Sequence, residues 1–205
     1  MHVVLETQRL ILRRFVESDV ENLVELDADP EVMQFINGGR PTPRSIIQDR
    51  LLPMYLAQYA NDDLYGRWAA VEASTGAFLG FFHFRPGPDR PVDEPELGYR
   101  LRRSAWGLGY ASEGTRALID KGFHAWGAQR VIAQTMVVNL ASRRVMEKAG
   151  LRPVRKFRMN WPDQIEGSGQ GDIEYAITRA EWAQLLSSGQ AAQPLPHRAS
   201  RRVRG

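Results

Sequence analysis

Two glycines directly before a predicted helix are the first residues whose type and spacing could do chemistry. They lie in the segment WGLGYASEG, Trp106 to Gly114. Because neither Gly107 nor Gly109 carries a Cβ, the backbone there can approach a ligand closely. The helix that we expect from Ala111 would direct unpaired N–H groups and its positive dipole end at the same point. The segment predicts an anion site, typically for a phosphate, although two such glycines also form plain tight turns.

The two common nucleotide motifs fit this segment less well. The sequence contains no G-x-x-x-x-G-K-[ST], which excludes a P-loop nucleotidase. A dinucleotide-binding fingerprint needs a third glycine and a following strand that ends in an acidic residue. Gly114 comes two positions too late, and the next predicted strand ends in Val138-Asn139. We therefore do not expect the anion to belong to a dinucleotide.

The composition is that of an ordinary globular chain. Of the 205 residues, 43% are apolar and 25% charged. No apolar run approaches the roughly 20 residues that span a bilayer. The sequence has no cysteine, which excludes disulfides and an acyl-cysteine intermediate. The N-terminus lacks the basic start and long apolar stretch of a signal peptide, so we expect a cytoplasmic protein with no membrane partner.

The formal charge of +3 comes from the C-terminal end of the chain. Residues 187–205 contain four arginines and no acidic residue, which leaves about −1 for residues 1–186. We predict one domain over 1–186 and a basic, disordered tail over 187–205. Nucleic-acid binding is not expected of the nearly neutral domain, and binding of a polyanion by the tail is the alternative.

The elements that must position WGLGYASEG follow an α+β order with one β-α-β crossover around it. A strand over 96–101 precedes the segment, and a strand rich in β-branched residues over 131–137 follows its helix. Pro53 should kink or split one of the N-terminal helices. The other expected strands are 9–15, 68–73, 78–84, 154–159 and 173–177, and the expected helices are 18–28 (from a Ser18–Glu21 capping box), 30–35, 42–59, 111–126, 141–149 and 179–187.

A second motif lies one strand after the first, in NLASRRVMEKAGL, Asn139 to Leu151. The six residues from Trp106 to Ala111 match [Q/R]-x-x-G-x-[G/A] at the fourth place, a glycine, and at the sixth, an alanine, while Trp106 departs from the Gln or Arg of the first. With both motifs at this separation, the chain over about residues 5–185 resembles the GNAT N-acetyltransferases. The aromatic Trp106 and the sequence ELGYRL before it resemble the branch of ribosomal-protein N-terminal acetyltransferases. The resemblance implies a mixed, mostly antiparallel central sheet of about six to seven strands flanked by helices, with a β-bulge or splay at the acyl-CoA site.

The resemblance also implies acetyl-CoA as cosubstrate. Asn139 would bond the pantetheine arm or a water, or would only cap the helix that follows it. A backbone amide near Tyr99 or Leu101 would polarise the thioester oxygen. No metal site is expected, because the histidines lie apart from any carboxylate cluster at ligand spacing. The pyrophosphate would be bound by the backbone amides of Leu108, Gly109, Tyr110, Ala111 and Ser112.

Acyl transfer to an amine needs a base that removes a proton from the ammonium and an acid that protonates the leaving thiolate. By the resemblance, Glu96 at the start of strand 96–101 matches the family's carboxylate base; an exposed carboxylate at a strand end is the alternative. Many members carry a tyrosine seven residues after the motif asparagine, but Met146 stands there and cannot donate a proton. Ser142 matches the donor of the ribosomal-type branch, unless it only caps its helix.

The function implied by the resemblance is transfer of acetyl from acetyl-CoA to a primary amine by direct attack in a ternary complex. The acceptor could be a protein N-terminus or a small amine such as a polyamine, amino sugar or amino acid, and a homodimer is left open. The alternative is a catalytically weak acyl-CoA-binding sensor or interaction module. The presence of Glu96 and Ser142 argues against that alternative, and Met146 leaves it open.

Overall fold

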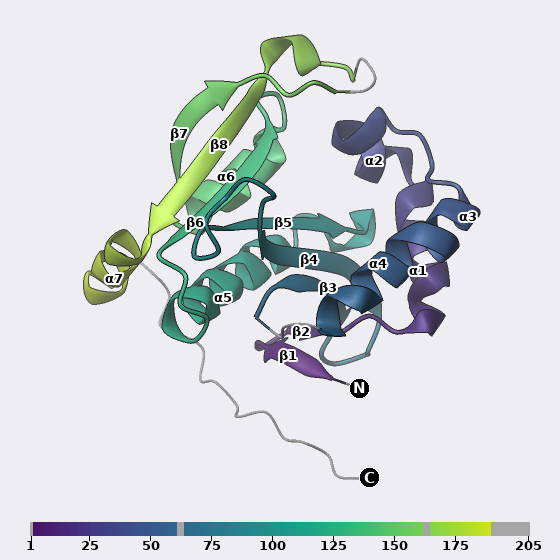
Figure 1. The fold of residues 1–205 in the computed structure, drawn as a ribbon, viewed down its shortest axis with the longest axis horizontal. Coiled ribbons are helices and arrows are strands. Elements are labelled where there is room, and N and C mark those ends of the chain that lie inside the picture. Colours follow the sequence, from purple (N-terminus) through teal and green to yellow (C-terminus); the bar gives the residue numbers. More distant parts are fainter. Residues whose placement is uncertain (1, 61–63, 162–164, 190–205) are drawn as a thin grey trace.

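Eight strands form one sheet in the described part of the computed structural model, residues 2–60, 64–161 and 165–189 (Figure 1). The strands are β1 (Val3–Glu6), β2 (Leu10–Arg13), β3 (Gly66–Glu72), β4 (Phe78–Pro86), β5 (Pro95–Leu101), β6 (Arg130–Met136), β7 (Arg152–Phe157) and β8 (Asp172–Thr178). The helices are α1 (Val20–Ala28), α2 (Pro30–Asn37), α3 (Arg44–Ile46), α4 (Leu52–Ala57), α5 (Tyr110–His124), α6 (Leu140–Lys148) and α7 (Arg179–Ser187).

The sheet order is β1-β2-β3-β4-β5-β6-β8-β7, and every neighbouring pair is antiparallel except β5 and β6. The parallel pair with α5 between its strands confirms the predicted crossover. The mixed, mostly antiparallel α+β architecture is also confirmed. The sheet has eight strands and not the expected six to seven because β1 was not predicted. This edge strand has four residues and pairs only with β2, and it is too short for an alternation of apolar and polar residues to be recognised.

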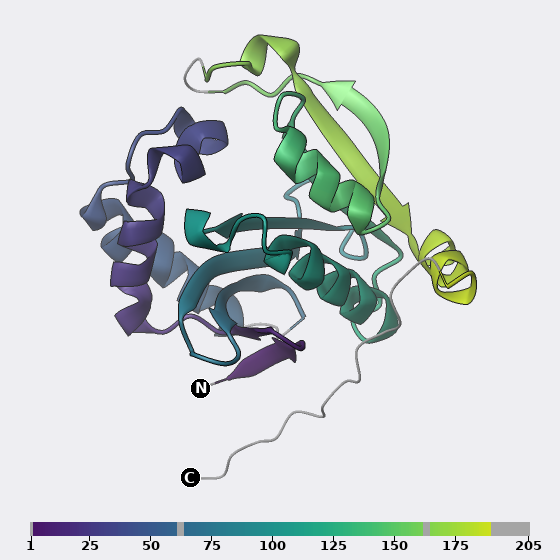
Figure 2. The same cartoon turned by 180° about the vertical axis from the view of Figure 1, so that it is seen from behind.

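Helices cover both faces of this sheet (Figures 1 and 2). On one face, α1, α2 and α4 bury an apolar cluster against β3 and β4, and the rings of Tyr55, Phe15 and Phe81 contact one another within it at tilted or edge-on angles. On the opposite face, α5 and α6 pack on the sheet, and α7 lies at the end of β8. The sheet therefore has a separate core on each side, and the central strands β4 and β5 lie between the two.

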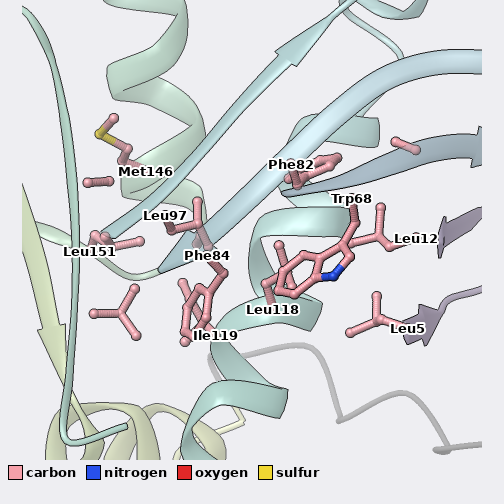
Figure 3. Packing of buried hydrophobic residues seen from close by; sticks show 14 of the residues in the cluster. Leu5, Leu12, Trp68, Phe82, Phe84, Leu97, Leu118, Ile119, Met146 and Leu151 are labelled. Carbon is pink, nitrogen blue, oxygen red and sulfur yellow. The ribbon is translucent and has the colours of Figure 1, made fainter. Parts of the chain in front are cut away.

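The α5 helix lies against the aromatic side chains of β3 and β4 (Figure 3). Phe82 and Phe84 are fully buried beneath it, together with Trp68. A Cβ added at Gly114 would lie 2.4 Å from Cζ of Phe82, so only glycine allows this approach. The close contact positions the N-terminal half of α5 relative to the sheet.

The N-terminal helices confirm the split expected near Pro53 and depart from prediction at Ser18. The expected helix over 42–59 is divided into α3 and α4 by a π-helical turn at Ile47–Leu51, with Pro53 in the first turn of α4. The Ser18–Glu21 capping box does not form, because a 3-10 turn precedes α1. There Asp19 accepts a hydrogen bond from the Val16 amide at 2.9 Å, a cap that pattern matching at Ser18 missed.

The C-terminal end of the described chain is α7. The predicted basic tail concerns residues 187–205, of which 190–205 lie outside the described residues. Among the helices that are described, none is both long enough and apolar enough to cross a membrane.

Candidate active site

The turn before α5 presents a group of free backbone amides. Gly107 and Gly109 have φ angles of 73° and 87°, which side-chain-bearing residues rarely adopt, and α5 begins one residue before the predicted start. Within the described residues, no backbone or side-chain acceptor bonds the amides of the five positions predicted for the pyrophosphate. These are Leu108, Gly109, Tyr110, Ala111 and Ser112. The turn therefore has the donor set and dipole end that an oxyanion requires.

The connection between β1 and β2 holds this turn in place. Arg9 donates to the Leu108 carbonyl at 2.9 Å and to a Glu113 carboxylate oxygen at 2.7 Å. Thr7 donates its hydroxyl to Glu113 at 2.6 Å, and the Arg9 guanidinium lies 4.7 Å above the Tyr110 ring. Sequence reasoning missed Arg9 and Thr7, because about a hundred residues separate them from the turn and no local pattern links them.

The parallel strands β5 and β6 separate next to the turn. The two strands pair in register at one position, where Glu96 lies beside Ile132. Tyr99 and Leu101 lie further along β5, where this pairing has ended, so their strand edge is not used by β6. The Trp106 indole donates to the Leu101 carbonyl at 2.9 Å and ties the turn to the end of β5. The expected splay is present, whereas the bulge in this region lies in β4, at a register shift against β3.

Two predicted site residues meet at the opening that the separated strands β5 and β6 leave beside α6. The Tyr99 hydroxyl donates to Oγ of Ser142 at 3.3 Å, and its ring packs 5.7 Å from that of Phe82. Burial raises the pKa of Tyr99 to about 12, so this hydroxyl keeps its proton across the physiological range. Asn139 caps α6, accepting from the Ser142 amide at 3.1 Å. The cap is therefore Asn139, and the Ser142 hydroxyl is directed to Tyr99.

Glu96 lies beside the separation of β5 and β6, at the position that still pairs with Ile132, and on the other face of the sheet. Alternation along β5 sends the side chains of residues 96 and 99 to opposite faces. Glu96 is opposite Arg85 of β4 and is only partly exposed. Burial raises the pKa of Glu96 above its usual range, against the attraction of Arg85 and Arg90. A carboxylate with a raised pKa is a better proton acceptor than an ordinary one.

Comparison with known proteins identifies the family of this chain. Residues 9–152 match the family described as the acetyltransferase (GNAT) domain. The chain belongs to the GNAT acetyltransferases. It is 35% identical over 188 residues to the FsC-acetyl coenzyme A-N(2)-transacetylase of Aspergillus fumigatus, covering 88% of this chain and 78% of the relative. The protein is thus an acyltransferase, and its family uses acetyl-CoA as cosubstrate.

Solved GNAT structures share the fold at lower identity. An acetyltransferase of the GNAT family from Bacillus anthracis superposes with a TM-score of 0.71 and 23% identity, over 86% of this chain and 98% of its own. Spermidine N-acetyltransferase from Vibrio cholerae, in complex with CoA and spermine, gives a TM-score of 0.68 at 16% identity, over 85% and 98% of the two chains. At these identities the likeness establishes the fold and leaves the acceptor of this GNAT enzyme undetermined.

Met146 stands at the position, seven residues after Asn139, where the family resemblance predicts a tyrosine. Its side chain is 4% exposed and belongs to the core beneath α6, as Figure 3 shows. The position is therefore a packing site here, and Tyr99 is the tyrosine whose hydroxyl reaches the opening. Among the described residues no group of three or more histidines, aspartates and glutamates is placed to hold a metal ion.

Proposed function

We propose that this chain transfers the acetyl group of acetyl-CoA to a primary amine by direct attack in a ternary complex. One observation carries the proposal: a partly buried carboxylate and a hydroxyl pair flank the point where β5 and β6 separate. Glu96 lies on one face of β5, and Tyr99 with Ser142 lies on the other. The base acts on the acceptor nitrogen and the acid on the thioester sulfur, so the two groups must lie on different sides of the carbonyl carbon that is attacked.

The coenzyme would lie along the free amides and the opening. The amides of Leu108 to Ser112 fit a pyrophosphate, since they have no acceptor within the described chain. The Asn139 side chain uses its oxygen to cap α6, which leaves its NH₂ group to donate to the pantetheine arm or to a water. The bound coenzyme supplies a thioester, and the amide of Tyr99 or Leu101 would donate to its carbonyl oxygen.

The side chains would then move two protons. Glu96 takes a proton from the acceptor ammonium, directly or through water, and the freed amine attacks the thioester carbon. The new C–N bond forms as the C–S bond breaks. Ser142 donates its hydroxyl proton to the departing sulfur. The attacking nitrogen loses its second proton as the amide forms, and that proton returns to the Ser142 oxygen, directly or through water, so that Ser142 is restored. Tyr99 donates a hydrogen bond to Ser142 and holds that hydroxyl in orientation. No acyl-cysteine step is available, because the sequence has no cysteine.

A small-molecule amine is the acceptor class that we favour. The relative at 35% identity bears a name that describes acetyl transfer from acetyl coenzyme A to an N2 position of FsC. The resemblance of Trp106 and ELGYRL to the ribosomal-protein branch predicts a protein N-terminus instead, and that prediction stays open, as does a homodimer. Small amines and peptides with a free N-terminus can be supplied as acceptors in the same assay, which distinguishes the two classes.

The test is release of free CoA from acetyl-CoA with mixed small amines and peptides as acceptors. We expect amine-dependent release by the wild type and a loss of about 100-fold or more in Glu96→Gln, the usual effect of removing a general base. Ser45→Ala, an exposed residue of α3, is the control and should retain full activity. If acetyl-CoA binds in calorimetry but no acceptor accelerates CoA release, the chain is a binding module. If acetyl-CoA does not bind, the placement of the coenzyme is wrong.

A further inference from the structure

The face of the sheet that carries Glu96 also carries a row of basic side chains. The register places Arg67 of β3 opposite His83 of β4, and His83 opposite Gly98 of β5. One step along, Arg85 lies opposite Glu96. Residues directly opposite on antiparallel strands have Cβ atoms about 5 Å apart, so these side chains are immediate neighbours. Gly98 leaves room for the His83 ring, which would lie 2.3 Å from a Cβ added there.

Arg67 and Arg85, here called the arginine pair, differ from the other arginines on this face. Arg100 forms an ion pair with Asp27. By contrast, neither member of the arginine pair lies within 4 Å of a carboxylate in the described residues, 2–60, 64–161 and 165–189. Arg67 lies 4.9 Å over the Tyr55 ring, and Nε of Arg85 is buried without any hydrogen-bond acceptor.

The neighbouring side of the same face shows how this fold normally neutralises such charges. Glu174 is 2% exposed and accepts from Arg90 at 2.5 Å, from Gln134 at 2.9 Å and from Arg155 at 3.0 Å. Arg130 pairs with Glu94 there at 2.8 Å. The guanidinium groups on that side are thus matched by carboxylates, whereas the arginine pair next to Glu96 is not.

The charge balance around Glu96 is therefore positive. Arg67, Arg85 and Arg100 against Glu96 and Asp27 leave one net positive charge, and protonation of Glu96 would leave two. His83 adds none, because burial and the three surrounding arginines lower its pKa to about 3. Burial and the charge of Arg85 also lower the pKa of Arg67. A partly buried guanidinium is costly without a counter-charge, so an anion is the expected partner.

We propose that the acceptor of this enzyme carries an oxyanion, a carboxylate or a phosphate, which Arg67 and Arg85 bind while the acceptor amine lies at Glu96. The inference rests on the proposed function and names the acceptor's chemistry. Two planar guanidinium forks match the oxygens of either group with charge-assisted hydrogen bonds. Since Arg85 is opposite Glu96, the anion and the amine must be separated by only a few bonds. A polyamine would place further cations against the arginine pair and is disfavoured.

The test compares amines that differ only in the anion. Glycine, β-alanine and 4-aminobutyrate are paired with their primary amides, O-phosphoethanolamine is paired with ethanolamine, and spermidine is the polycation. We expect the acids, or the phosphate ester, to have KM values about 10- to 100-fold below their neutral partners, the range of a charge-assisted hydrogen bond. The carboxylate and phosphate arms identify which oxyanion is used.

The variants locate that preference. Arg67→Gln and Arg85→Gln should raise KM for the anionic amines about 10- to 100-fold and leave KM for the neutral amines unchanged. Arg85→Lys keeps the positive charge but loses the planar guanidinium fork, so it should raise KM for the anionic amines less than Arg85→Gln does. It replaces Arg85→Gln in the test if that variant does not fold. Arg50→Gln is the matched control, because Arg50 is exposed and has no recorded partner in the described chain. It should keep the wild-type preference.

Calorimetric binding of the N-acetylated acids and N-acetylated amides gives a readout that does not need turnover. If no amine is acetylated but the N-acetylated acids bind and lose affinity in Arg67→Gln and Arg85→Gln, the proposed function fails and the anion site stands. If neutral amines or spermidine are used as well as the anionic ones, the enzyme functions but the anion proposal is overturned. It is also overturned if the arginine variants weaken acids and amides alike, or if the acids neither react nor bind.

Discussion

The hydroxyl pair of Tyr99 and Ser142 allows the proposed acid to be tested residue by residue. Ser142→Ala removes the hydroxyl that we assign to the leaving thiolate, and it leaves the Asn139 cap intact because that cap uses the Ser142 backbone amide. Alanine is also a good helix former, so α6 should be preserved. The substitution therefore isolates one proton donor without disturbing the helix that presents it.

The size of the effect follows from the chemistry of the hydrogen bond. A bond to a group that is gaining negative charge contributes about 1.5–3 kcal/mol, so its loss should lower kcat about 10- to 150-fold. Tyr99→Phe keeps the ring on Phe82 and removes only a neutral donor to Ser142. Its loss of about 0.5–1.5 kcal/mol predicts a fall in kcat of about 2- to 13-fold. The double variant should be little worse than Ser142→Ala alone, since Tyr99 acts through Ser142.

The assay is continuous release of CoA with the best acceptor, measured as kcat and KM separately for each variant. Because Ser142 is assigned to the transition state, kcat and kcat/KM for acetyl-CoA should fall together while KM stays constant. The control Ser45→Ala should match the wild type. A Ser142→Ala variant that keeps more than half of kcat would refute the assignment. An effect of Tyr99→Phe that adds fully to that of Ser142→Ala would refute the relay between them.

Three further predictions concern Glu96, Gly114 and Arg9. Because burial raises the pKa of Glu96, kcat/KM should decline on acidification with a midpoint above pH 4.5, as the base becomes protonated. Arg85→Gln removes a charge that lowers this pKa and should move the midpoint to higher pH; an unmoved midpoint would show that another group titrates. Gly114→Ala should lower the unfolding free energy by about 1–3 kcal/mol in urea titrations despite its better helix propensity, since its Cβ meets the Phe82 ring; an unchanged midpoint would contradict the packing. Arg9→Gln should weaken CoA binding in calorimetry about 3- to 10-fold by loosening the turn before α5, with kcat at saturating acetyl-CoA nearly unchanged; equal affinity would show that the turn holds its shape alone.

Sequence periodicity located the elements around the site because each is a local pattern. The strands β5 and β6 and the helices α5 and α6 lie within two residues of their predicted ends. A helix start with two glycines and a helix preceded by asparagine carry their signals within a few residues, and caps act over that range. The split of the helix over 42–59 near Pro53 was predicted, but its form, a π-helical turn at Ile47–Leu51, was not, since such a turn has no distinct composition.

The sequence by itself determined the family, the turn predicted to bind an anion and the residues Glu96, Asn139 and Ser142 as candidates, because their motifs are contiguous. Only the tertiary structure decided which of these groups meet. The contact of Tyr99 with Ser142 spans 43 residues and depends on how α6 packs beside β5. The arginine pair depends on sheet register, since a slip of one residue would send Arg85 to the other face. Register and packing are properties of the folded chain, and they convert separate candidates into one site.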